Sequence, residues 1–225
     1  MNSIESEQQK INHPAKFSDK FIPFFAEKLK GCKIVLDPMA GTGKVALIKK
    51  CGWKGIIICN EIEPEFAKLF NYPVDQWFFE DAVYIPLHSE FVDAICTSPT
   101  YGNRLADHWN RQEFSKRFSY TFCLGHALQS GNTGQMHWGD HYRQKHEAIY
   151  QECYRVLAPK GLFIINISDH IRQKQIIPVV DFHKQTLLKL GLNLIEDKTF
   201  PTQRLRYGSN AKARVEAEHI LIFQK

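Results

Sequence analysis

Two glycines separated by a single residue, Gly41 and Gly43, follow a short apolar run that ends at Asp37. The run at residues 34–36 predicts a buried strand, and the residues after the second glycine have a helical pattern. Glycines allow a ligand to approach the backbone closely, and the first turn of a helix offers N–H groups without partners. At the carboxyl edge of a parallel sheet, such a turn predicts a site for a nucleotide-like ligand.

An acidic residue follows the next apolar run and would lie at the same edge of the sheet. Residues 55–59 predict a second buried strand, and Glu61 comes shortly after it. A carboxylate in that place can accept hydrogen bonds from both ribose hydroxyls of a nucleoside. Glu61 is therefore the first candidate for a ribose contact and Glu63 the second. The alternative for such an acid is the start of the following helix, a position that Glu65 fits through the helix dipole.

Three ligand classes compete for the glycine stretch. A phosphate-binding P-loop requires a glycine where this chain has Pro38 and a serine or threonine where it has Val45, which excludes that class. The dinucleotide fingerprint G-x-G-x-x-A fits residues 41–46, with Glu61 as the acid that follows it. The third class is S-adenosylmethionine (SAM), and a glycine-rich turn that binds no ligand is the alternative to all three.

Residues 36–43, Leu-Asp-Pro-Met-Ala-Gly-Thr-Gly, resemble the first motif of class I methyltransferases, including the Asp-Pro directly after the strand. The resemblance implies that SAM is the cofactor. It also implies that the chain contacts SAM through the residues that match the motif, Asp37, Met39, Gly41 and Gly43, with Glu61 on the ribose.

Two further segments extend the resemblance. Residues 13–17, His-Pro-Ala-Lys-Phe, are similar to the segment of DNA amino-methyltransferases that closes over the methionine end of SAM, which adds Phe17 to the cofactor-binding residues. A short third strand is predicted at residues 77–79, and Asp81 and Ala82 match the class I position that contacts adenine. The alternatives are a plain entry loop for the first segment and an ordinary turn residue for the aspartate.

The most specific resemblance is Ser98-Pro99-Thr100-Tyr101, which follows a predicted strand at residues 91–97. Amino-methyltransferases carry (Asp/Asn/Ser)-Pro-Pro-(Tyr/Phe/Trp) at this place, so the resemblance implies that Ser98, Pro99 and Tyr101 are catalytic. The Ser98 hydroxyl and the Pro99 carbonyl would accept the two hydrogens of an exocyclic amine and hold its nitrogen in line with the SAM methyl group. Tyr101 would stack on a base that has rotated out of its helix.

Thr100 departs from this motif, which has a second proline in its place. The change removes rigidity but keeps the Pro99 carbonyl, so we expect activity to survive, and a catalytically weakened relative stays open as an alternative. A serine at position 98 favours cytosine N4 as the target, without excluding adenine N6.

Two segments outside the minimal fold have the composition of nucleic acid-binding loops. Residues 102–145 interleave aromatic side chains with cations, which suits base stacking and phosphate contacts, or else form a lid with its own small core. Residues 199–215 contain cations and no acid, and a merely solvated loop is the alternative there. The predicted nucleic acid-binding residues are Arg104, Arg111, Lys116, Arg117, Arg204, Arg206, Lys212 and Arg214. Histidines between positions 108 and 146 match no standard zinc spacing, so no metal is expected.

These residues require an α/β framework to position them. We expect one Rossmann-like class I methyltransferase domain over residues 1–225, with a seven-stranded, mostly parallel sheet whose last strand is antiparallel. The later strands are expected at residues 162–167, 192–196 and 219–223, and helices at residues 18–31, 45–51, 64–70, 146–157 and 177–190. Residues 155–161, Arg-Val-Leu-Ala-Pro-Lys-Gly, resemble a structural passage of class I methyltransferases.

Composition narrows the setting of the protein. The chain has 225 residues, a net charge of +5 and six scattered cysteines without a C-x-x-C pair. We therefore expect reduced thiols in a cytoplasmic protein, and the mild positive charge permits an anionic partner. No apolar run approaches the roughly 20 residues of a membrane span, and residues 1–10 lack the apolar core of a signal peptide.

The resulting prediction is SAM-dependent methylation of an exocyclic amino group of a DNA base. Members of the group often carry a separate target-recognition domain after the catalytic core. None is recognised here, so recognition is expected from residues 102–145, from residues 199–215 or from the second subunit of a homodimer. The nearest alternative is a tRNA or rRNA base N-methyltransferase with RNA as its partner. A SAM-binding protein without catalysis and a dinucleotide oxidoreductase, for which no hydride-transfer site is found, are the others.

Overall fold

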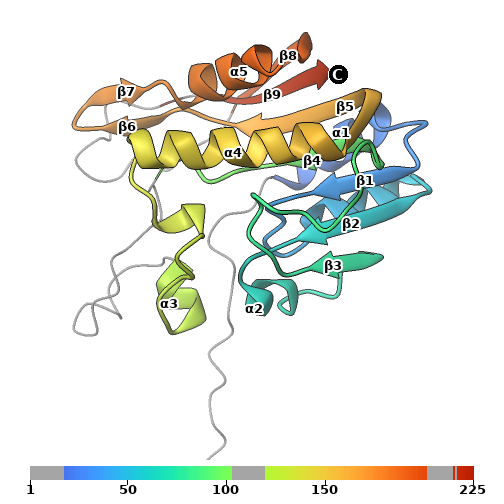
Figure 1. Cartoon of the computed structure of the whole chain (residues 1–225), viewed down its shortest axis with the longest axis horizontal. Helices are drawn as coiled ribbons and strands as arrows, with labels where there is room; N and C mark the ends of the chain where they lie inside the picture. Colours follow the sequence, from blue (N-terminus) through green and yellow to red (C-terminus); the bar gives the residue numbers. More distant parts are fainter. Residues whose placement is uncertain (1–17, 103–119, 202–214, 216) are drawn as a thin grey trace, which may run out of the picture.

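A seven-stranded sheet lies at the centre of the protein (Figure 1). The computed structural model describes residues 18–102, 120–201, 215 and 217–225. In spatial order the strands are β3 (Gln76–Phe78), β2 (Ile56–Asn60), β1 (Ile34–Asp37), β4 (Val92–Thr97), β5 (Leu157–Ile167), β9 (Ala217–Gln224) and β8 (Asn193–Pro201). The pairs from β3 to β5 are parallel, whereas β9 is antiparallel to both of its neighbours. The predicted fold class, including the antiparallel last strand, is confirmed.

Helices cover both faces of the sheet. The helical segments are η1 (Asp19–Phe21), α1 (Ile22–Lys28), η2 (Lys44–Cys51), α2 (Pro64–Ala67), α3 (Tyr120–Leu124), η3 (Thr133–Gln135), α4 (Asp140–Val156) and α5 (Val179–Lys189). Because successive side chains of a strand point to opposite faces, Val35 and Ala94 join one apolar cluster with α1 and η2. Leu36 and Ile95 join the other with α4 and α5. This packing on both faces fixes the register of β1 and β4, whose carboxyl ends meet at one edge of the sheet.

Several elements differ from those expected from the sequence. Helix α4 begins at Asp140 and not at residue 146, because its first turns bury Tyr142 and His146, polar side chains that weaken the apolar pattern. The segment after the glycine loop is a 3₁₀ helix, and the first expected helix is divided into the short 3₁₀ turn η1 and α1, with a proline in the first turn of α1. A small hairpin, β6 (His170–Arg172) and β7 (Gln175–Ile177), follows β5 and was not expected.

The described part of residues 102–145 packs beside α2 at the carboxyl edge of the parallel strands (Figure 1). Tyr120 and Cys123 of α3, together with Leu128, bury their side chains against Phe66 of α2 in a third, smaller apolar cluster. This part of the segment therefore shares a core with the main domain. Among the described residues, no helix is both long enough and apolar enough to cross a membrane.

Candidate active site

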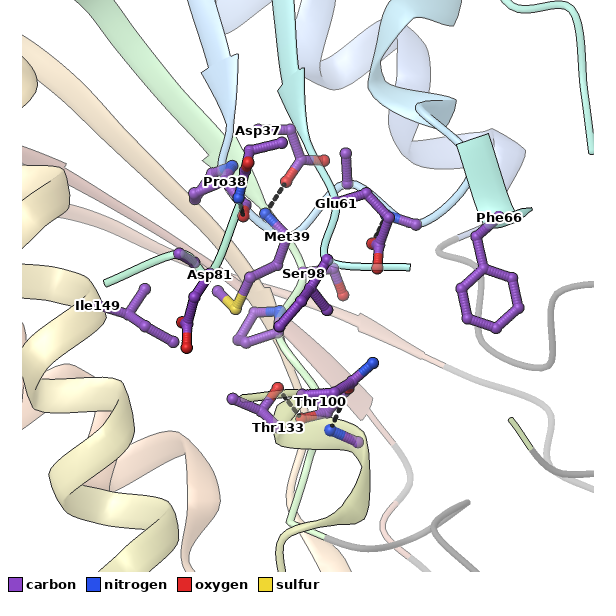
Figure 2. Close-up of a pocket in the computed structure, with 18 of the residues that line it drawn as sticks. Asp37, Pro38, Met39, Glu61, Phe66, Asp81, Ser98, Thr100, Thr133 and Ile149 are labelled. Carbon is purple, nitrogen blue, oxygen red and sulfur yellow. Dashed lines mark hydrogen bonds between the residues drawn. The ribbon is translucent and has the colours of Figure 1, made fainter. Parts of the chain in front are cut away.

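A cavity of about 310 Å³ opens at the carboxyl ends of β1, β2, β3 and β4. Figure 2 shows side chains from these strand ends converging on it, with Thr133 of η3 on the opposite wall. Predicted site residues that line the cavity are Asp37, Met39, Gly41, Glu61, Asp81, Ala82, Ser98, Pro99 and Tyr101. The structure thus brings most of the predicted cofactor residues and all three predicted catalytic residues to a single cavity.

The two glycines of the loop after β1 have different surroundings. Both have left-handed backbones, with φ of 55° at Gly41 and 75° at Gly43, and glycine adopts that conformation without steric cost. Gly41 lines the cavity and donates its N–H to Glu61 Oε2 at 2.7 Å. Gly43 lies outside the cavity lining, and a Cβ atom there would meet the side chains of Trp77 and Val74 at 2.8 Å. Close packing of these side chains, as well as the backbone angle, requires glycine at position 43.

Asp37 ends β1 beneath the glycine loop. Its Oδ1 accepts the Met39 N–H at 3.2 Å, and this contact is drawn in Figure 2. The side chain is almost fully buried, and burial raises the pKa of the Asp37 carboxyl to about 7 because the charged form loses its hydration.

Glu61 follows β2 and faces the cavity from the neighbouring strand (Figure 2). It accepts the Gly41 N–H with Oε2 and the Glu63 N–H, at 3.0 Å, with Oε1. Burial raises the pKa of Glu61 to about 7, the two backbone N–H donors oppose that rise, and the charges of Glu63 and Asp37 add to it. The ribose contact predicted for Glu61 stays a prediction.

Glu63, the second ribose candidate, binds another segment of the protein. It is buried outside the cavity lining, where Oε1 accepts the Gln129 N–H at 2.7 Å and the Asn132 Nδ2–H at 2.9 Å. The carboxylate therefore fixes the segment before η3 to the end of β2. No sequence pattern indicates this pairing, because its partners lie more than sixty residues apart.

Asp81 lies at the end of β3 with a cation at its side. Its Oδ2 forms an ion pair with Lys145 Nζ of α4 at 2.5 Å, and its Oδ1 accepts the Val83 N–H at 3.2 Å. Gly131 packs so closely that a Cβ atom there would lie 2.3 Å from Asp81 Oδ2. Lys145 was not predicted as a site residue, since its role depends on the early start of α4.

Ser98, Pro99, Thr100 and Tyr101 follow β4 and reach the same cavity. The Ser98 hydroxyl donates to Asn166 Oδ1 at 3.4 Å. Thr100 Oγ1 donates to Thr133 Oγ1 at 2.9 Å (Figure 2), and the Thr100 carbonyl accepts the Tyr142 hydroxyl at 2.5 Å. The residue that departs from the usual motif is therefore held through both its side chain and its backbone.

Behind Thr100 lies a buried chain of polar side chains that sequence reasoning missed. His183 Nε2 contacts the Tyr142 hydroxyl at 2.9 Å, and His183 Nδ1 contacts the Tyr150 hydroxyl at 2.6 Å. Burial holds the pKa of His183 well below its usual range, so the ring is neutral and carries one N–H. Spacing gave one available signal, because Tyr142, His146 and Tyr150 recur every four residues and share one face of α4.

Other predicted residues fall outside the described part of the chain. These are Phe17 and the nucleic acid-binding candidates Arg104, Arg111, Lys116, Arg117, Arg204, Arg206, Lys212 and Arg214. Within residues 18–102, 120–201, 215 and 217–225, no group of three or more His, Cys, Asp or Glu side chains could hold a metal ion.

Solved structures with a similar fold include several SAM-dependent methyltransferases. The [4+2]-cyclase SpnF has a TM-score of 0.59 and 13% identity, covering 92% of this chain and 81% of its own. A SAM-dependent methyltransferase from Methanosarcina mazei has a TM-score of 0.55 and 11% identity, covering 90% and 97%. The 1,6-didemethyltoxoflavin-N1-methyltransferase of Burkholderia thailandensis, solved with S-adenosylhomocysteine, has a TM-score of 0.51 and 12% identity, covering 92% and 77%. Identities this low establish the fold alone, and no curated protein sequence matches the chain.

The sequence itself identifies the family. The model of the DNA methylase family matches residues 92–225, which run from β4 and the Ser98–Tyr101 motif to the end of the chain. The match covers more than half of the protein and confirms the resemblance to amino-methyltransferases at the level of the family. Fold and family together support SAM as the cofactor. This protein is a member of the DNA methylase family.

Proposed function

We propose that this protein is a SAM-dependent methyltransferase that modifies an exocyclic amino group of a DNA base, cytosine N4 or adenine N6. The observation that supports this function most strongly is the shared cavity. The glycine loop and Glu61 line it from one side, and Ser98, Pro99 and Tyr101 line it from the adjoining strand end. A methyl donor and an acceptor amine held by these two groups of residues would lie next to each other.

The charge of the cavity fits SAM better than a dinucleotide. Carboxylates outnumber cations in its ionisable lining, which includes Asp37, Glu61 and Glu218 as well as Lys44. SAM carries a sulfonium and an ammonium cation, which these carboxylates attract, whereas the pyrophosphate of a dinucleotide would be repelled. Burial has raised the pKa of Asp37 and Glu61 to about 7, so a cationic ligand would stabilise both carboxylates in their charged form.

The residues that would hold SAM follow from this arrangement. Glu61 would accept the ribose hydroxyls, Asp37 and the Gly41 loop would hold the methionine end, and Asp81 and Ala82 would contact the adenine. When bound, SAM supplies an activated methyl group. Lys145 neutralises Asp81 from the side of α4, so Asp81 accepts a hydrogen bond without adding a full uncompensated charge.

The Ser98 motif would act on the acceptor. An exocyclic amine is a poor nucleophile because its lone pair is delocalised into the ring. Hydrogen bonds from its two N–H groups to the Ser98 hydroxyl and the Pro99 carbonyl would favour a tetrahedral nitrogen and restore the lone pair. Tyr101 would stack on the extruded base and supply binding energy that does not depend on base identity.

Methyl transfer from labelled SAM tests this function. We expect label in double-stranded DNA, recovered after digestion to nucleosides as N4-methylcytosine or N6-methyladenine by mass. Ser98→Ala should bind SAM as tightly as the wild type and transfer methyl groups at least about tenfold more slowly, because its contact strengthens in the transition state. If label appears in RNA and not in DNA, the proposed substrate is wrong and RNA is the substrate. SAM binding without any transfer would leave only a binding protein.

A further inference from the structure

Asn166, near the end of β5, joins two residues of the cavity wall through one side-chain amide. It is fully buried. Its Nδ2 donates to Glu218 Oε2 at 3.2 Å and to the His219 carbonyl at 3.4 Å, and its Oδ1 accepts the Ser98 hydroxyl at 3.4 Å. Glu218 and Ser98 both line the cavity.

The partners of this amide allow one orientation. With the amide rotated by 180°, its oxygen would face the Glu218 carboxylate and the His219 carbonyl, which have no hydrogen to donate. Burying an amide without its hydrogen bonds destabilises the folded state, so Nδ2 stays on the side of Glu218 and Oδ1 on the side of Ser98.

The orientation of the amide sets the orientation of the serine. An amide oxygen only accepts hydrogen bonds, so the Ser98 hydroxyl donates its hydrogen to Asn166. The lone pairs of Ser98 Oγ are left for a donor that enters the cavity. A group that presents an N–H meets an acceptor there, whereas a carbonyl oxygen or an unprotonated ring nitrogen meets a second acceptor.

We propose that Asn166, oriented by Glu218, is a positioning residue that makes Ser98 a hydrogen-bond acceptor towards the substrate. This inference rests on the proposed function and deepens it, because it states which edge of a base the site selects. Bases that present an amino group next to the ring nitrogen, as cytosine and adenine do, satisfy the acceptor. A base edge with a carbonyl oxygen in that place does not.

A double-mutant cycle tests whether Asn166 acts through Ser98. In the wild-type background, Asn166→Ala should lower kcat about tenfold, the size of one lost hydrogen bond that matters in the transition state, with an unchanged Kd for SAM. In the Ser98→Ala background the same substitution should cause no further loss, because the hydroxyl it orients is gone. An equal loss in both backgrounds would overturn the proposal.

Two further variants separate positioning from a general effect on folding. Glu218 is only partly buried, so Glu218→Ala should leave the core of the sheet intact. If Asn166→Ala does not fold, Glu218→Ala replaces it in the double-mutant cycle with Ser98→Ala. It should likewise lower kcat only when Ser98 is present. Ser168→Ala removes a hydrogen bond to the Ala217 carbonyl and is the matched control, expected to lower stability and keep kcat. Loss of kcat in Ser168→Ala equal to that in Asn166→Ala would contradict positioning. If the wild type methylates an amine but the two substitutions have additive effects, this inference is wrong and the proposed function stands. If the wild type methylates no amine, both the proposed function and this inference are wrong.

Discussion

Thr100 shows how one residue can depart from a motif and still be held in place. A proline at this position would restrict the backbone through its ring. The threonine is restrained by two hydrogen bonds, from its hydroxyl to Thr133 and from the Tyr142 hydroxyl to its carbonyl. The sequence predicted the motif from its residue types. It could not predict these restraints, because both partners come from distant segments that fold back over the end of β4.

The ionisation of Glu61 gives a prediction at the same scale. Ribose hydroxyls donate hydrogen bonds to a carboxylate, and the pKa of about 7 leaves much of Glu61 protonated below neutral pH. SAM affinity should therefore rise as pH increases from 6 towards 7, by up to about tenfold per pH unit for each carboxyl that must ionise. Calorimetry in buffers of different ionisation enthalpy should show proton release at pH 6.5. Glu61→Gln should reduce that release, and a wild-type affinity independent of pH would contradict the role of Glu61.

At the scale of elements, helix α4 connects the core to the cavity. Its Lys145 forms the ion pair with Asp81, and its Tyr142 hydroxyl donates to the Thr100 carbonyl. Tyr150, also on its buried face, contacts the far side of His183. The hydrogen bonds have one consistent direction, since Tyr142 donates to a carbonyl and must accept from His183 Nε2–H. His183 Nδ1 then accepts the Tyr150 hydroxyl.

Two tyrosine-to-phenylalanine substitutions distinguish the roles of the two tyrosines that contact His183. Tyr142→Phe and Tyr150→Phe each remove a buried hydroxyl, so each should lower the free energy of unfolding by about 1–3 kcal/mol in urea denaturation. Only Tyr142→Phe removes the contact with the Thr100 carbonyl, so only this variant should also slow methyl transfer. Equal transfer rates for the two variants would mean that the Thr100 carbonyl needs no anchor.

Prediction of elements from the sequence succeeded where apolar runs end at Asp37-Pro38 and Ser98-Pro99, because a buried strand followed by proline has a clear boundary. These boundaries placed the glycine loop and the motif correctly at one edge of the sheet. Sequence-based prediction was less successful for α4 and β8, because their exposed and polar residues obscure the apolar periodicity of the helix and the strand. The wall of the cavity at residues 131–134 was also missed, since it depends on tertiary contacts of Glu63.

For the whole molecule, buried titratable groups link stability to pH in opposite directions. Burial lowers the pKa of His146 to about 4, so its contribution to stability is complete above the unfolded value of about 6.5 and is lost as pH falls towards 4. Asp37 and Glu61 behave in the opposite sense, because their raised pKa values give stability that is complete below their unfolded values and is lost as pH rises towards 7.

A variant at His146 isolates the first of these contributions. His146→Leu removes a ring that must stay neutral inside the core, so the variant should lose less stability than the wild type between pH 7 and pH 5. The difference should be about 2 kcal/mol, from the fraction of the histidine shift that falls in this interval. Urea denaturation at both pH values measures it, with Tyr150→Phe as a variant that keeps the histidine. The same acid sensitivity in His146→Leu and wild type would assign it to other groups.

The contacts of Glu63 also set an order of events when the chain folds. The strands up to β4 can pair before residues 129–132 have been synthesised, whereas the donors to the Glu63 carboxylate among the described residues all come from that later segment. A carboxylate buried without hydrogen bonds costs several kcal/mol, so it stays in water until this segment docks. Burial of Glu63 and closure of the cavity wall are consequently one event, and a nascent chain that ends before α3 carries the glycine loop and the Ser98 motif without the enclosed cavity between them.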